Sequence, residues 1–174
     1  IENIRLDNFV LEPDYGSTFF CFNAFAGCVK YRGNGLVALL RTLPVGVFCS
    51  ATAMFSGCAA FDLDFEGIPL KLRGNAGGIF TSCVNFRGTG IQNFNLAEAT
   101  SLIGFFQGCS ELSNVIFTES WHAPKATTAS QMFLSATKFN GAGVQHLFKN
   151  VSAVASLSRF AENTPNWTQP LTTW

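Results

Sequence analysis

The sequence predicts a single α/β solenoid of about six coils, each with a short helix and a short strand, and a parallel sheet along one side. Three observations support this prediction. One short phrase recurs through the chain, its apolar residues have helical spacing, and glycine turns followed by alternating segments separate the copies. Residues 1–17 precede the first copy and are expected to form an N-terminal cap segment, and residues 18–174 form the repeat solenoid.

The recurring phrase starts with a phenylalanine and ends, three residues later, at a position here called the cysteine slot. Copies begin at Phe25, Phe55, Phe80, Phe106, Phe133 and Phe160, and the slot holds Cys28, Cys58, Cys83, Cys109, Ala136 and Asn163. Subtracting successive phenylalanine positions gives periods of 30, 25, 26, 27 and 27. These periods lie in or beside the 20–29 range of leucine-rich repeats. The phenylalanines and slot cysteines are therefore the predicted structural core.

The phrase and the residues before it have the spacing of a short amphipathic helix. Ala51, Met54, Phe55 and Cys58 lie at i, i+3, i+4 and i+7, and the same offsets recur in the first, third, fourth and fifth copies. This spacing places the four side chains on one helical face. A two-turn helix does not persist alone in water, so each is expected to bury this face against neighbouring coils.

The second half of each repeat has a different pattern. A Gly-x-Gly turn stands at residues 33–35, 88–90 and 141–143, and an apolar residue follows each turn. Residues 68–72 and 91–96 then alternate approximately between apolar and polar, which is typical of strands. Strands stacked once per repeat would form the parallel sheet.

Composition narrows the range of functions. Lys plus Arg and Asp plus Glu both total 11, and no basic block is present, which argues against a nucleic-acid partner. No uninterrupted apolar stretch is long enough to suggest direct membrane insertion. No nucleophile motif or paired catalytic histidine is evident, so we expect a protein that is not an enzyme and needs no cofactor.

The cysteines are expected to be buried free thiols rather than disulfides or metal ligands. Cys21 and Cys28 are seven residues apart, too far along a helix for a bridge, and no Cys-x-x-Cys pair is present. Cys49 lies outside the slot, and the pattern leaves its state open. The acidic residues Asp62, Asp64 and Glu66 match no calcium loop and are better explained as a solvated edge.

The later copies resemble a known family. Thr128-Ala129-Ser130-Gln131-Met132-Phe133, followed by Ala136 and Phe139-Asn140, is similar to the repeat of the BspA-type leucine-rich repeat proteins, as is the ending Trp167-Thr168-Gln169-Pro170-Leu171-Thr172-Thr173-Trp174. The Trp-Asp-Thr-Ser segment that usually follows in that family is missing. Such proteins occur on bacterial and protozoan surfaces and in some phages. The resemblance implies attachment without catalysis and supplies no ligand-binding residue.

Two functions are therefore expected. The first is a surface-exposed module that binds a protein or glycan receptor in adhesion, and the second is a structural component of a large assembly, such as a virion decoration or tail-fibre protein, that contacts neighbouring subunits. Either would place the protein outside the cell, on a cell surface or on a virion surface. The candidate contact residues are bulky or cationic side chains of the strand half and its insertions: Trp121, His122, Arg73, Arg87 and Gln92. Trp121 could equally fill a gap in the core.

Overall fold

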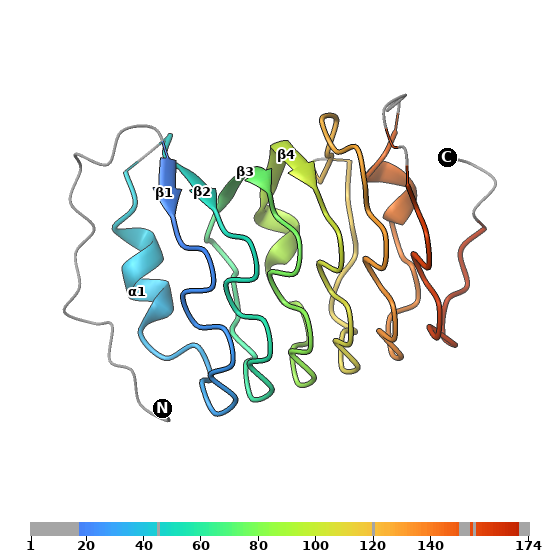
Figure 1. The fold of residues 1–174 in the computed structure, drawn as a ribbon, viewed down its shortest axis with the longest axis horizontal. Helices are drawn as coiled ribbons and strands as arrows, with labels where there is room; N and C mark the ends of the chain where they lie inside the picture. The colour runs from blue at the N-terminus through green and yellow to red at the C-terminus, as the bar shows by residue number, and fades with distance from the viewer. Residues whose placement is uncertain (1–17, 45, 120, 150–153, 155, 171–174) are drawn as a thin grey trace.

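The structure, a computed structural model, describes residues 18–170 apart from 45, 120, 150–153 and 155. The predicted cap, residues 1–17, lies outside the described residues. Two Asn-x-Ser/Thr triplets, at Asn150 and Asn166, match the glycosylation sequon. The first lies outside the described residues, and Asn166 is exposed in a turn. Six similar coils, each containing one phenylalanine of the phrase, lie side by side along the long axis (Figure 1). We number them coil 1 to coil 6 from the N-terminus.

A parallel sheet lies along one side of the coils. Its strands are β1 (Thr18–Phe20), β2 (Phe48–Ser50), β3 (Lys71–Asn75) and β4 (Asn95–Ser101), paired in the order β1-β2-β3-β4. Single parallel bridges from Ser101 to Thr128 and from Thr128 to Ser156 continue this line into coils 5 and 6. The arrows in Figure 1 accordingly lie at the same end of successive coils.

The prediction of an α/β solenoid with one helix in every coil is wrong. The described residues contain one α-helix, α1 (Leu36–Arg41), and two 3-10 helices, η1 (Ile91–Asn93) and η2 (Val144–His146). None of these covers the recurring phrase, which folds instead as a series of turns. In the second to fifth copies the i, i+3, i+4 and i+7 side chains are buried nevertheless, because the turns also point them into the core, whereas in the first copy Ala24 is exposed and Cys28 is half-buried.

Hydrogen bonding between coils explains why the phrase is not helical. In coil 1 the N–H groups of residues 23, 25 and 27 donate to carbonyl oxygens of coil 2, and only the intervening N–H groups bond within the coil. Each coil also has two residues in the left-handed region, four positions apart, such as Ala53 (φ 52°) and Gly57 (φ 75°). A right-handed helix accommodates neither feature. The small residue before the cysteine slot therefore marks a turn.

Helices occur instead in the return segments, the stretches between one phrase and the next strand. Each begins directly after a Gly-x-Gly turn whose second glycine has a positive φ: Gly35, Gly90 and Gly143. A Cβ at Gly90 would overlap the backbone of Phe65 and Glu66 in coil 2. All three glycines therefore permit the left-handed turn, and Gly90 and Gly143 also permit the close approach of neighbouring coils.

The core is a stack of phenylalanine rings, as the repeat predicted. Neighbouring rings from Phe25 to Phe133 lie 5.5–5.8 Å apart at 3–18°, and Phe160 meets Phe133 edge to face. All six phenylalanines are buried. A second row of large side chains, one per coil, packs against these rings: Tyr31, Phe61, Phe86, Leu112, Phe139 and Trp167. All of them are fully buried except Trp167, which is partly buried.

The slot cysteines bind carbonyl groups of the preceding coil. Sγ of Cys58, Cys83 and Cys109 lies 2.9–3.0 Å from the carbonyl oxygen of the previous coil's phenylalanine. In coil 6 the hydroxyl of Thr164, rather than Asn163, donates the equivalent bond to Phe133 at 2.8 Å. The slot of the last copy is therefore Thr164, one residue later than the Asn163 expected from the sequence.

All six cysteines are free thiols, and the state of Cys49 is thereby assigned; it is buried, as are the others except the partly exposed Cys28. Burial raises the pKa of Cys58 to about 11. Burial also raises the pKa values of Cys83 and Cys109.

Candidate functional site

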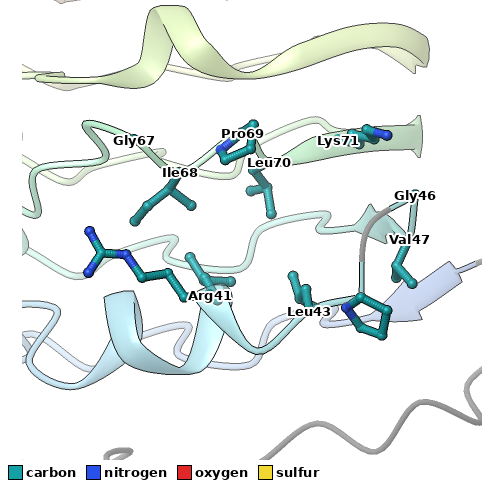
Figure 2. A pocket seen from close by; sticks show the side chains of 11 residues that line it. Arg41, Leu43, Gly46, Val47, Gly67, Ile68, Pro69, Leu70 and Lys71 are labelled. Carbon is teal, nitrogen blue, oxygen red and sulfur yellow. The ribbon is translucent and has the colours of Figure 1, made fainter.

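A hollow lies between the return segments of coils 1 and 2. Its volume is about 320 Å³, at the lower end of the range for small-ligand pockets. One wall is the end of α1 and the loop that leads to β2, and the other is the segment 67–71 that leads into β3 (Figure 2). Seven of the lining residues are aliphatic or proline: Leu40, Leu43, Pro44, Val47, Ile68, Pro69 and Leu70. We call this the apolar hollow.

The first wall of the apolar hollow owes its shape to the end of α1. After Arg41 the helix stops at Thr42, whose hydroxyl donates to the carbonyl of Leu39 at 2.7 Å. Leu40 is buried, whereas Leu43 and Val47 beyond the helix are half-buried at the rim. The core face of the helix thus merges with a partly exposed apolar loop.

Two cations complete the lining. Arg41 is exposed and Lys71 is half-buried. Within the described part of the chain, neither has an ion-pair or hydrogen-bond partner, and no acidic residue lines the apolar hollow. Three surface lysines differ from these two cations: Lys125, Lys138 and Lys149 each form an ion pair with a glutamate of the preceding coil.

A second, polar hollow adjoins the first across Gly67 and Pro69. It lies between the return segments of coils 2 and 3, and Gln92, Asn93 and Asn95 supply amide groups to it. The Gln92 side chain has one distant contact, 3.5 Å from Nε2 to Oε2 of Glu66, and its Oε1 is buried without a partner. Gln92 is the one sequence-predicted contact residue that the structure places in either of these hollows.

The other aromatic candidate lies in the core. Trp121 is fully buried and stacks on Phe117 at 4.1 Å, with Phe106 beyond it. Its side chain is therefore not available to a partner, and the core-filling alternative holds. His122, the next residue, is half-buried, and its Nδ1 is enclosed without a hydrogen-bond partner.

The two arginine candidates connect coils. Arg73 lies 4.0 Å from the ring of Phe48 in β2 and donates to Oγ1 of Thr18 in β1 at 3.1 Å. Arg87 binds Asp62 of the preceding coil through Nε, Nη2 and its backbone N–H. Each side chain is thus occupied by intramolecular contacts to other coils.

Sequence reasoning missed Arg41 and Lys71. Thirty residues separate them, and only the stacking of coils 1 and 2 brings them to one hollow. A signal was present in the excess of leucine and proline after Gly35, which extends the first repeat to a period of 30. Lys71 stands in a run that is otherwise apolar at residues 68–72, where it reads as an ordinary outward strand residue.

The described residues offer neither a metal site nor a membrane-spanning helix. Among the described residues, no three His, Cys, Asp or Glu side chains cluster closely enough to hold a metal ion. In the same part of the chain, no helix has the length and apolar character needed to cross a bilayer.

Comparison with known proteins assigns the chain to a family. No curated protein and no solved structure matches the sequence. A family model described as a Mycoplasma protein of unknown function, DUF285, matches residues 49–174. This match spans β2 to the last coil and therefore covers most of the repeat region. The protein belongs to the DUF285 family.

Proposed function

We propose that this protein is a non-enzymatic recognition module that binds a partner protein through the return segments of coils 1 to 3, outside the cell or on its surface. The observation that carries the proposal is the apolar hollow with its two cations, Arg41 and Lys71, for which the described residues supply no partner. Apolar surface enclosed beside unsatisfied charge is the combination that association with a complementary partner stabilises.

The distribution of sequence variation within the chain supports this assignment. The phrase keeps its phenylalanine in all six copies and its slot cysteine in the first four, because these side chains form the core. The return segments differ in length and in structure: coil 1 has an α-helix, coil 3 a 3-10 helix, and the residues before β3 in coil 2 have neither. A constant core with variable return segments is the arrangement by which repeat proteins present different binding surfaces.

Selection of ligands from an unbiased library tests the proposal. Random linear peptides displayed on phage would be selected on the immobilised protein, and the bound peptides mapped by chemical-shift perturbation on the ¹⁵N-labelled chain. We expect the largest perturbations at residues 40–47 and 67–71. A glycan array probed in parallel tests the alternative that the receptor is a carbohydrate.

One pair of variants makes the mapping decisive. Val47→Asp puts a charge at the rim of the apolar hollow, whereas Ile116→Asp changes a side chain that is 66% exposed and outside it. Val47→Asp should weaken selected peptides at least tenfold without a large change in melting temperature, and Ile116→Asp should leave their affinity unchanged. Peptides that bind Val47→Asp as well as the parent protein would refute the proposal.

A further inference from the structure

The two cations lie at opposite ends of the apolar hollow. In Figure 2 the guanidinium of Arg41 extends at one end, near Ile68 and Gly67, and Lys71 lies at the other. Between them are Ile68 and Leu70 of one wall and Leu43 of the other. The lining is therefore cationic, then apolar, then cationic along its length.

This order of charges selects the charge of the occupant. Lys71 is half-buried, and no group among the described residues pairs with its ammonium group. A carboxylate from a ligand would provide the missing counter-charge, and no acidic side chain of the lining would repel it. A cationic or purely apolar ligand would leave Lys71 uncompensated.

The length of the wall limits the size of the occupant. Residues 68–71 run from beside Arg41 to Lys71; fully extended they would span roughly 10 Å, and the hydrogen bond from the Leu70 N–H to the Ile68 carbonyl makes this wall shorter than that. Four or five residues of an extended peptide span that distance. The volume of about 320 Å³ accommodates a few aliphatic side chains rather than a folded element.

We propose that the apolar hollow binds an extended peptide segment of the partner in which two acidic side chains, four residues apart, flank an aliphatic side chain on the same face. The acidic groups pair with Arg41 and Lys71, and the aliphatic side chain between them packs on Ile68, Leu70 and Leu43. This inference rests on the proposed function, because it names the kind of partner that the same surface recognises.

Defined peptides test the inference. The probe is the acetylated and amidated pentapeptide Glu-Leu-Val-Leu-Glu, and the matched control is Gln-Leu-Val-Leu-Gln, which keeps the aliphatic residues and removes both charges. Titration into the ¹⁵N-labelled protein gives the dissociation constant and the binding site together. We expect the acidic peptide to bind at least fivefold more tightly, with perturbations at residues 40–47 and 67–71 and an affinity that falls as salt increases.

Matched variants separate the two cations from general surface charge. Arg41→Gln and Lys71→Gln should each weaken the acidic peptide severalfold and leave the neutral peptide unchanged. Arg32→Gln removes an exposed cation that does not line the apolar hollow, and it should leave both affinities unchanged.

The outcomes distinguish the inference from the proposed function. Equal binding of the two pentapeptides, or binding of octanoate in preference to the acidic peptide, would overturn the inference. If library-selected peptides occupy the apolar hollow but Glu-Leu-Val-Leu-Glu does not, the acidic partner class is wrong and the recognition function stands. If no peptide of either origin perturbs residues 40–47 and 67–71, both are wrong.

Discussion

Replacing Cys83 by alanine should lower the free energy of unfolding by about 1–2 kcal/mol. Its Sγ is buried and lies 3.0 Å from the carbonyl oxygen of Phe55. Deleting this one atom removes buried apolar volume and leaves a small cavity, which costs about 1 kcal/mol. Loss of the weak thiol hydrogen bond adds roughly 0.5 kcal/mol.

Coil 5 provides the reciprocal change in the same protein. Ala136 occupies the slot there, and no side chain of the described residues donates to the carbonyl oxygen of Phe106. Ala136→Cys should therefore add the missing thiol contact and raise the free energy of unfolding by about 0.5–1 kcal/mol. In both coils cysteine is therefore expected to be more stabilising in the slot than alanine.

Urea unfolding followed by tryptophan fluorescence and far-ultraviolet circular dichroism measures both variants. Coincident transitions from the two probes are needed, because repeat arrays can unfold in parts. In a domain of this size the Cys83→Ala cost corresponds to a fall in Tm of about 2–8 °C. Destabilisation by Ala136→Cys, or no effect of Cys83→Ala, would show that the thiol-to-carbonyl contact does not stabilise the stack.

Three further predictions concern the core, the coil contacts and pH. Phe106→Ala should cost about 3–5 kcal/mol in urea unfolding, because the ring lies between those of Phe80 and Phe133 at 5.8 and 5.6 Å. Gly90→Ala should cost more than about 2 kcal/mol in the same assay, since the new methyl group would overlap the backbone of the neighbouring coil at a φ of 81°. Above pH 9 stability should fall as pH rises, because the buried thiols keep their protons in the folded state and lose them once unfolded. For Cys58 this loss runs from its ordinary pKa of 9.0 to about 11, and each thiol contributes a slope of up to about 1.4 kcal/mol per pH unit, measured by unfolding at a series of pH values.

Each of these predictions has a matched control. Val29→Ala removes a side chain that is 56% exposed and should change stability far less than Phe106→Ala. Gly46→Ala has open space around its new methyl group and a similar φ of 97°, so it measures the cost of conformation without the overlap. Cys83→Ala should flatten the alkaline dependence by the contribution of one thiol, and an unchanged slope would contradict the assignment of that dependence to the cysteines.

The core could be predicted from the sequence because the buried side chains recur at regular spacing. A phenylalanine every 25 to 30 residues was enough to infer a stack of coils with a parallel sheet on one side. The same spacing led to the wrong prediction of a helix in every coil, because a run of turns can bury the i, i+3, i+4 and i+7 positions as a helix does. Gly27, Gly57 and Gly108 are the residues that distinguish turns from a helix, because glycine destabilises a short helix and favours a left-handed turn.

The binding surface was less predictable than the core. Trp121 is a bulky residue in a long insertion, which is typical of a contact residue, yet it is buried in the core and stacks on Phe117. The cationic side chains of Arg73 and Arg87 favour them as contact residues, but the structure shows both engaged with other coils. Whether a side chain is free depends on contacts between coils, which a single sequence does not display.

The position of the apolar hollow nevertheless follows from the spacing of the repeat. The phrase keeps its register because the coils hydrogen-bond to one another through it, so differences in repeat length must be absorbed by the return segments. Coil 1 has a period of 30 and coil 2 a period of 25, and the extra residues of coil 1 form α1 and the loop to β2. The segment at residues 67–70 beside them contains no helix and cannot cover that loop, which leaves Leu43 and Val47 half-buried. In repeat proteins of this kind, a long repeat followed by a short one should therefore mark a hollow at their junction, and the charges on its rim should indicate what binds there.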